Sequence, residues 1–197
     1  MDFELLVKLR KSVRKYEVDK KPDRALIEKC LEAARMAPSA CNSQPWSFII
    51  VDDEELVQLV AKECTPLVGK INSFAKTAPV IIVQVIDKTN IQASIGSKMT
   101  DRDFNYIDSG LSMGYLCLQA AELGLGTCIM GYFHEDKIKK LLDIPKSRRI
   151  GLLCTLGYEK GGQTESAKKR KQPEDMIFYN RYMLREDENK RFDFQGE

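Results

Sequence analysis

The sequence predicts an α+β fold with about four core strands and one central helix. Runs of β-branched and aromatic residues alternate with segments whose apolar residues recur at helical spacing, and no internal repeat is found. The chain has 197 residues, of which 43% are hydrophobic and 30% are charged. This length and composition are ordinary for one globular domain, so a single domain over residues 1–197 is expected.

The apolar patterns set the order of the elements. Helical spacing predicts helices over residues 2–10, 22–37, 53–64, 67–76, 106–123 and 134–142. Dense β-branched and aromatic residues predict strands over residues 46–51, 79–86, 127–132 and 149–157. The polar stretch 87–102 is expected to be a long loop and is a candidate lid or pocket wall. Residues 158–197 have too little apolar content for a core of their own, so an extended C-terminal arm is expected there.

Charge and histidine content exclude several classes of function. Lys and Arg total 31 against 29 Asp and Glu, a formal net charge of +2. This balance gives no electrostatic case for a general nucleic-acid or anionic-membrane binder. The sequence has one histidine, His134, which excludes a site built from several histidines, and no metal site is predicted. We interpret His134 as a surface residue at the start of a helix.

The cellular compartment is inferred from the N-terminus and the cysteines. A signal peptide needs a basic start followed by a continuous apolar run, and residues 1–11 have neither. The longest apolar stretch, residues 79–86, is far shorter than the ~20 residues of a membrane helix. The six cysteines form no CxxC pair, and most sit in apolar segments, which is typical of buried, reduced thiols. We therefore expect a cytoplasmic protein with no membrane partner.

The first candidate binding motif is Arg10-Lys11-Ser12-Val13-Arg14. Three cations flank a hydroxyl group where the first helix ends, and in an extended chain alternate side chains project to the same side. Arg10, Ser12 and Arg14 can therefore converge on one anion. Guanidinium groups suit phosphate because they form paired, charge-assisted hydrogen bonds. A solvated basic run is the alternative interpretation.

The second candidate motif is the segment APSACNSQPW over residues 37–46. Its two prolines favour a rigid loop, and its small residues allow a planar ligand to approach the backbone. Ser39, Asn42 and Gln44 offer hydrogen-bond donors and acceptors to such a ligand. A turn whose polar groups satisfy its own backbone is equally consistent with these residues.

Two further motifs are ambiguous on local grounds. The segment GLGTCIMGY over residues 124–132 has the spacing GxGxxxxG and leads into a strand, so the pyrophosphate-binding argument for glycine loops fails. It is either a tight turn or a strand end that exposes backbone N–H groups to a ligand. The segment AKKRK over residues 167–171 is an exposed charged loop, a second phosphate clamp, or a nuclear-localisation or nucleic-acid patch.

Taken together, these motifs resemble the nitroreductase family of flavin-dependent oxidoreductases. The matching pieces are residues 10–14, residues 37–46, Asp108 in the opening of the central helix, residues 124–131, and Lys168 with Arg170. They occur in the family order, and APSxxNxQPW is the specific element among them. The resemblance implies a nitroreductase-like α+β fold, with a central mixed or antiparallel sheet flanked by helices. It also implies a homodimer across which the C-terminal arms are exchanged.

The resemblance further implies a cofactor and a reaction. Each homodimer would bind two FMN molecules at the subunit interface and take reducing equivalents from NADH or NADPH. A ping-pong mechanism would pass them to nitroaromatics, quinones or similar small acceptors. Flavin N5 would carry the chemistry, so no side chain is assigned as catalytic. The implied FMN-binding residues are Arg10, Lys11, Ser12 and Arg14 of one subunit with Lys168 and Arg170; Pro38, Ser39, Ala40, Asn42 and Gln44 of the other; and the backbone around Ile129, Met130 and Gly131.

Three alternatives stay open. An FMN-binding or sensing protein would show slow turnover. A flavin-fragmenting or dehalogenating relative would share the fold, although the sequence has no large insertion to form a lid over an iodotyrosine. A nucleic-acid binder acting through residues 168–171 would show steeply salt-dependent binding, and the near-neutral net charge argues against it.

Overall fold

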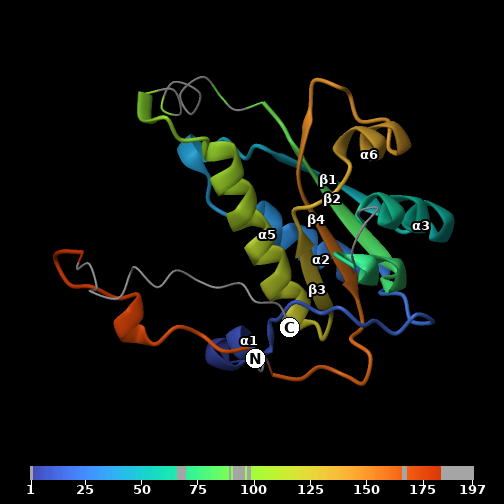
Figure 1. Ribbon diagram of the computed structural model, residues 1–197, viewed down its shortest axis with the longest axis horizontal. Helices are drawn as coiled ribbons and strands as arrows, with labels where there is room; N and C mark the ends of the chain where they lie inside the picture. The colour runs from blue at the N-terminus through green and yellow to red at the C-terminus, as the bar shows by residue number, and fades with distance from the viewer. Residues whose placement is uncertain are drawn as a thin grey trace. The chain divides into compact units, whose positions relative to one another are not determined.

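A computed structural model describes residues 2–65, 70–88, 90, 96, 99–165 and 168–182. Residues 1–166 and 167–197 form two units, and each is described by itself. At the centre of the first unit is a sheet of four strands, β1 (Trp46–Val51), β2 (Val80–Ile86), β3 (Gly126–Met130) and β4 (Arg149–Gly157), in the spatial order β1-β2-β4-β3 (Figure 1). All three strand pairings are antiparallel, which confirms the predicted α+β class.

Helices cover both faces of the sheet, so the first unit has three layers (Figure 1). On one face, α3 (Glu54–Glu63) and α6 (Glu135–Leu141) bury Val57, Val60 and Ile138. On the other face lie α2 (Arg24–Arg35) and α5 (Phe104–Glu122). Because both faces are covered, every residue of β2 is buried, and the strand is apolar along its length except at Gln84.

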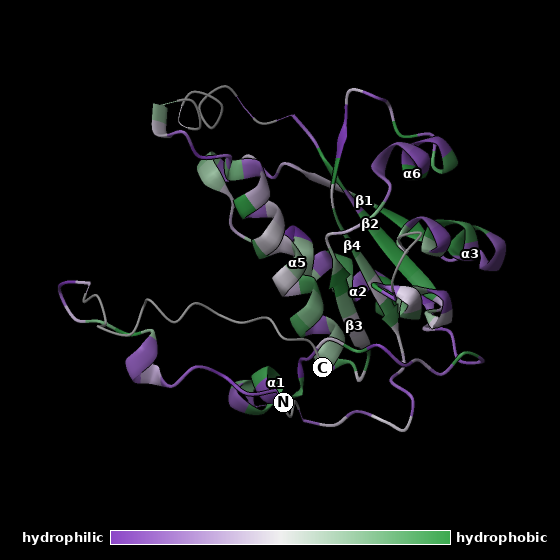
Figure 2. Cartoon of the chain, viewed as in Figure 1, coloured by the Kyte–Doolittle hydropathy of each residue, from purple (hydrophilic) through white to green (hydrophobic). Residues whose placement is uncertain are grey.

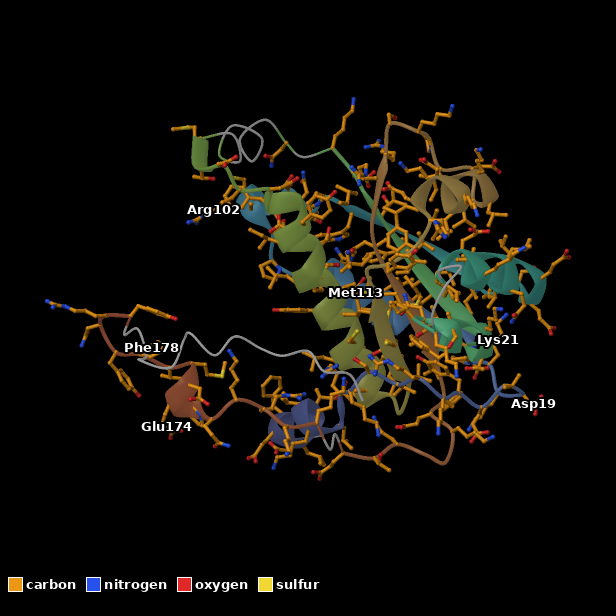
Figure 3. All side chains as sticks on the ribbon, in the orientation of Figure 1. Asp19, Lys21, Arg102, Met113, Glu174 and Phe178 are labelled. Atoms are coloured by element: carbon orange, nitrogen blue, oxygen red, sulfur yellow. The ribbon has the colours of Figure 1, made fainter. Side chains whose placement is uncertain are left out.

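The 19-residue helix α5 is the central helix that the sequence predicts. Met113, halfway along it in Figure 3, is fully buried together with Leu116 and Ala120 in the apolar layer shared with α2 and the sheet. The helix begins after Asp103, whose side chain accepts a hydrogen bond from the Asn105 N–H. It ends at Glu122, and Gly124 shortly beyond has a φ of +74°, the left-handed conformation that commonly follows the end of a helix.

Most predicted elements are confirmed, and the strands over residues 46–51 and 149–157 have the predicted bounds. The strand predicted over residues 127–132 covers Gly126–Met130. The helix predicted over residues 67–76 is wrong in its described part, since Ser73–Thr77 forms a 3₁₀ helix, η2. The reason is local: Asn72 has a left-handed backbone with φ of 57°, which an α-helix cannot contain.

Two predictions fall partly outside the described residues. In the stretch predicted as a loop, residues 87–102, positions 96, 99 and 100 are helical, and positions 89, 91–95 and 97–98 lie outside the described residues. In the predicted arm, residues 158–165 belong to the first unit, tied to it by an antiparallel bridge between Tyr16 and Glu159. The described residues of the second unit, 168–182, contain one 3₁₀ helix, η3 (Pro173–Asp175), capped reciprocally by Gln172 and Asp175.

Candidate functional site

The segment that follows α1 (Phe3–Leu9) lies along the edge strand β3. Ser12 forms a parallel bridge with Thr127, and the Val13 N–H donates to the Thr127 carbonyl at 2.8 Å. Val13 is buried against Gly126, where an added Cβ would approach the Val13 side chain at 2.7 Å. Only glycine allows the two backbones to come this close. The basic segment is therefore held against the sheet as a short added strand.

Tyr16 anchors the same segment from its C-terminal side. Its hydroxyl donates to the Val13 carbonyl at 2.9 Å and lies 2.7 Å from Thr155 Oγ1. The ring is buried, and burial raises the pKa of Tyr16 well above its ordinary value, so the hydroxyl stays protonated. Sequence reasoning did not single out Tyr16. The available signal was a tyrosine within an otherwise polar run, two positions after Arg14.

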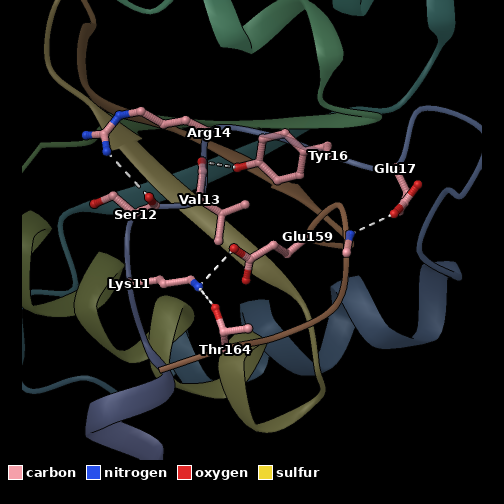
Figure 4. Close-up of polar contacts among 9 residues, drawn as sticks. Lys11, Ser12, Val13, Arg14, Tyr16, Glu17, Glu159 and Thr164 are labelled. Carbon is pink, nitrogen blue, oxygen red and sulfur yellow. Dashed lines mark hydrogen bonds and ion pairs between the residues drawn. The ribbon is translucent and has the colours of Figure 1, made fainter. Parts of the chain in front are cut away.

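The side chains of the basic segment divide between two sides (Figure 4). Lys11 Nζ forms an ion pair with Glu159 at 2.9 Å and donates to the Thr164 hydroxyl. The Arg14 guanidinium points away from this pair, lies 5.7 Å from the centre of the Phe74 ring and donates to the Ser12 carbonyl at 3.4 Å. Ser12 and Arg14 thus share one side, while the charge of Lys11 is balanced by Glu159 on the other.

The remaining predicted cations lie at the end of α1 and in the second unit. Arg10 is half-buried at the end of α1, where its backbone N–H donates to the Leu6 carbonyl at 2.9 Å. Lys168 and Arg170 belong to the second unit. There the Arg170 guanidinium donates to the backbone carbonyls of Lys168 at 3.3 Å and Lys169 at 3.2 Å. The proposed cooperation of Lys168 and Arg170 with Arg10 therefore stays a prediction.

The loop over residues 37–46 joins α2 to β1 and contains a 3₁₀ turn, η1 (Ala40–Asn42). Three of its residues have left-handed backbones: φ is 51° at Cys41, 51° at Asn42 and 47° at Gln44. Each non-glycine residue in this region costs about 1–3 kcal/mol and persists only where surrounding contacts enforce it. Such concentrated strain is typical of ligand-binding loops.

Hydrogen bonds within and around this loop enforce its shape. Ser39 Oγ accepts from the Gln44 N–H at 2.9 Å, and the Gln44 side-chain amide donates to Asn42 Oδ1 at 3.1 Å. Asn90 donates from its side chain to the Cys41 carbonyl at 3.0 Å. Some predicted ligand groups therefore satisfy the loop itself, as the turn interpretation expected. The exposed residues of the loop are Pro38, Cys41, Asn42 and Gln44.

A helix residue holds the start of this loop. Asp108 Oδ2, on α5, accepts a hydrogen bond from the Ala40 N–H at 3.0 Å. Asp108 is 3% exposed, and burial raises the pKa of its carboxyl although the Ala40 hydrogen bond lowers it. Asp108 is among the residues that carry the predicted resemblance, but only the structure shows its contact with the loop.

The end of β3 presents the third predicted set. Ile129 is 42% exposed, Met130 is buried, and Gly131 is exposed with open space where a Cβ would stand. This alternation is that of a strand with one solvent-facing side. The Asn72 side-chain amide donates to the Tyr132 carbonyl at 3.1 Å and holds the chain just beyond the strand. The backbone beside Gly131 is therefore open to a ligand.

The basic segment and the loop lie far apart within one chain. The loop enters edge strand β1 at Trp46, in the row of the sheet that includes Arg149 of β4. Ser12 lies along the opposite edge strand, β3, in the row of Leu156. Ser12 bridges to the outer edge of β3, so at ~4.8 Å per strand and ~3.3 Å per residue these points are about 19 Å apart across the sheet and about 20 Å along it. They flank opposite ends of α5 (Figure 1).

Other candidate chemistries depend on side chains elsewhere among the described residues. Among them, no group of three His, Cys, Asp or Glu side chains is placed to hold a metal ion. No helix in that part of the chain is both long and apolar enough to cross a membrane. His134 immediately precedes α6, which confirms its interpretation as a helix-start residue. Five of the six cysteines are buried, and burial raises the pKa of Cys30 and Cys64 to about 12, so these thiols are inert.

Comparison with known proteins identifies the class that this fold and these motifs define. The profile described as "Nitroreductase family" matches residues 7–158. The chain therefore belongs to the nitroreductase family, and the predicted resemblance and fold are confirmed. Membership of this family also supports an oxidoreductase activity for this chain.

Individual relatives differ in their named activities. The chain is 32% identical over 162 residues to a protein of Methanothermobacter thermautotrophicus named as a NADH dehydrogenase/NAD(P)H nitroreductase, covering 80% of this chain and 78% of that protein. It is 28% identical to an iodotyrosine deiodinase of Thermotoga neapolitana, covering 78% of this chain and 86% of that protein. A solved structure named as an FMN-dependent nitroreductase from Clostridium difficile is similar with a TM-score of 0.69 and 27% identity, over 90% of this chain and 98% of that chain.

Proposed function

We propose that this chain is an FMN-dependent oxidoreductase. It takes reducing equivalents from NADH or NADPH and passes them to nitroaromatics, quinones or similar small acceptors in a ping-pong cycle. Family membership supports this proposal, as do a relative named for NADH and NAD(P)H chemistry and a similar structure named as FMN-dependent. In flavin enzymes the cofactor carries the redox chemistry and the protein supplies binding and orientation.

The residues along β3 fit the phosphate end of FMN. The Arg14 guanidinium is exposed and carries five N–H donors, and the contact to the Ser12 carbonyl is long at 3.4 Å. The Ser12 side chain lies on the same side of the segment (Figure 4). A phosphate monoester with a charge of about −1.5 to −2 would be bound by such a pair of donors. We therefore assign Ser12 and Arg14 to the phosphate. The charge of Lys11 is balanced by its ion pair with Glu159.

The residues of the loop and of the end of β3 fit a planar ring. The loop over residues 38–44 presents exposed, short side chains, and Gly131 is exposed and has no side chain. When bound, FMN supplies the electron-accepting and electron-donating ring. The chain holds its phosphate, presents backbone groups to its edge and limits the space for an acceptor.

The observation that carries this proposal is the separation of the two motifs. Within one chain the loop and the basic segment flank opposite ends of α5 (Figure 1). If α5 of one chain packs antiparallel against α5 of a second copy, each basic segment comes to lie beside the partner's loop. A two-fold axis then builds two equivalent sites. We therefore infer a homodimer in which each FMN contacts both subunits.

The surface of α5 is suited to this pairing. Ile107, Leu111 and Tyr115 lie at helical spacing and are 51%, 43% and 42% exposed. Apolar positions recur along the helix in Figure 2. Gly110 and Gly114 lie between them, and a Cβ added at either would meet nothing within 4 Å. An exposed apolar stripe lined with glycines allows a second helix to approach closely.

The visible spectrum of the purified, FMN-reconstituted protein tests the proposal. Under anaerobic conditions, NADH and then NADPH are added, followed by a nitroaromatic or a quinone. We expect flavin absorbance to bleach with at least one nucleotide and to return with the acceptor. Bound flavin that never bleaches would overturn the nicotinamide-dependent cycle and support the FMN-holding alternative. A protein that cannot be reconstituted with FMN would overturn the proposal itself.

A second candidate activity is reductive dehalogenation of an iodinated aromatic. The observation that favours it is the similarity to an iodotyrosine deiodinase of Thermotoga neapolitana, of which 86% is covered. The candidate lid is the stretch over residues 87–102, and much of it lies outside the described residues. Iodide release from iodotyrosine by the reduced protein would support this activity. Reoxidation by quinone without iodide release would exclude it.

A further inference from the structure

A row of polar side chains crosses the apolar layer between the sheet and α5. Gln84 interrupts the apolar strand β2, is fully buried and donates from its side-chain amide to the Ser109 carbonyl at 3.2 Å. Asp108 and Ser112, one helical turn apart on α5, are 3% and 0% exposed. Burying polar groups costs free energy that apolar residues of similar size would not. Packing alone therefore does not account for this row.

Each member of the row fixes a different neighbour. Gln84 ties the second turn of α5 to the centre of the sheet. The Ser112 hydroxyl donates to the Ala34 carbonyl at 3.2 Å and so holds the last turn of α2. Asp108 accepts from the Ala40 N–H and so holds the loop that follows α2. Gln84 and Asp108 thereby fix the position of the loop relative to the sheet through α5.

Asp108 is a costly choice for stability alone. Burial raises the pKa of its carboxyl above the ordinary value of 3.8. Because the folded-state pKa is the higher one, ionisation of Asp108 opposes folding once the pH rises above that ordinary value. An apolar residue at this position would avoid this cost, but it would offer no oxygen to accept the Ala40 N–H. Ala40, whose N–H donates to Asp108, directly precedes the left-handed residues Cys41 and Asn42, which indicates what the Asp108 oxygen is used for.

We propose that Asp108 is a positioning residue for the cofactor site, holding the loop over residues 38–44 in its binding conformation by accepting the Ala40 N–H. Gln84 sets the place of the helical turn that carries Asp108. This inference rests on the proposed function, since that loop is the part of the site expected to contact the flavin ring. Asp108 acts through the loop backbone and touches neither the ring nor the acceptor.

FMN titration of three variants tests the proposal. Asp108→Ala removes the acceptor, and loss of one charge-assisted hydrogen bond predicts FMN binding weaker by about tenfold or more. Asp108→Asn keeps an oxygen that accepts the Ala40 N–H, so binding within about threefold of the original chain is expected. Ser112→Ala is the matched control, because it removes a buried hydrogen bond of the same helix to α2. It should lower the melting temperature and leave FMN affinity unchanged.

Hydrogen exchange in the protein without FMN gives an independent readout. Amides of residues 38–44 should exchange faster in Asp108→Ala, and at the original rate in Asp108→Asn and Ser112→Ala. Unchanged FMN affinity and exchange in Asp108→Ala would overturn the proposal. Equal weakening of FMN binding by Ser112→Ala would also overturn it, because the effect would then be one of general stability. If the original chain fails to bind FMN, the proposed function fails, while the exchange experiment still tests whether Asp108 holds the loop.

Discussion

Gly126 shows how one absent side chain places a whole segment. A Cβ there would meet Val13 Cγ2 at 2.7 Å and Val13 Cβ at 2.9 Å, so the segment carrying Ser12 and Arg14 would have to move. We expect Gly126→Ala to lower the free energy of unfolding by about 1–3 kcal/mol. FMN affinity should fall as well, measured by titration beside chemical denaturation.

The double variant Val13→Ala/Gly126→Ala is the matched control for this prediction. Removing the valine methyl groups relieves the contacts at 2.7 and 3.0 Å, while the Cβ contact at 2.9 Å remains, so only part of the lost FMN affinity should return. An affinity in Gly126→Ala equal to that of the original chain would show that the segment is not placed by this contact.

Glu135 joins α6 to β4 and makes stability depend on pH. Its carboxylate accepts from Lys139 Nζ at 2.9 Å, from the Ile150 N–H at 2.9 Å and from Arg149 Nε at 3.0 Å. Burial is the largest single effect and raises the pKa of Glu135. The three hydrogen bonds together outweigh it, so the net pKa lies below the ordinary 4.5. The stabilisation is therefore complete above pH ~4.5 and is lost as the pH falls through the lowered pKa.

Glu135→Gln tests this dependence. Lys139 is 8% exposed at its side chain, so removing its counter-charge should cost about 1–3 kcal/mol at neutral pH. Urea denaturation at pH 7 and at successively lower pH should show the difference from the original chain shrinking on acidification. Glu4→Gln breaks an exposed ion pair with Lys8 and should leave stability unchanged. A difference for Glu135→Gln that does not vary with pH would contradict the assignment.

At the scale of the element, a substitution on the exposed stripe of α5 tests whether two copies of the chain associate through this helix. Leu111→Glu places a charge in the middle of the exposed apolar stripe, and we expect monomers at micromolar concentration by sedimentation or light scattering. Leu59→Glu on α3 is the matched control, since Leu59 is 41% exposed against 43% for Leu111. Equal oligomeric states for the two variants would remove α5 from the interface.

The helices and strands differ in how well the sequence predicts them. The strands over residues 46–51 and 149–157 were predicted with their bounds because dense β-branched and aromatic residues mark buried strands locally. The helix over residues 67–76 was wrong where it is described, because the left-handed backbone of Asn72 leaves no trace in the apolar pattern. Gln84 was visible as a lone polar residue in an apolar strand. Its role depended on Ser109, in another element.

At the scale of the whole molecule, the proposed site between two subunits predicts complementation between defective subunits. Arg14→Ala and Asn42→Glu homodimers should both bind FMN poorly, one through the phosphate and the other through the ring. In a mixed dimer, one site carries both substitutions and the other carries neither. Refolding the two chains together in equal amounts should therefore restore about a quarter of the sites.

Flavin fluorescence and reductase activity measure this recovery, with each variant refolded alone as the control. No recovery in the mixture would mean that both motifs serve the same subunit's flavin. Normal flavin binding and activity in either variant refolded alone would mean that its substituted residue lies outside the site.

The sequence by itself determined the fold class, the order of most elements and the chemical types of the two candidate binding motifs. These properties depend on neighbouring residues: periodicity, turn-forming residues and the density of apolar side chains. Only the tertiary structure decided that Lys11 is paired with Glu159, that Asp108 holds Ala40, and that the two motifs lie at opposite ends of α5. The physical reason is distance along the chain. Asp108 and Ala40 are 68 positions apart, and such contacts are created by packing.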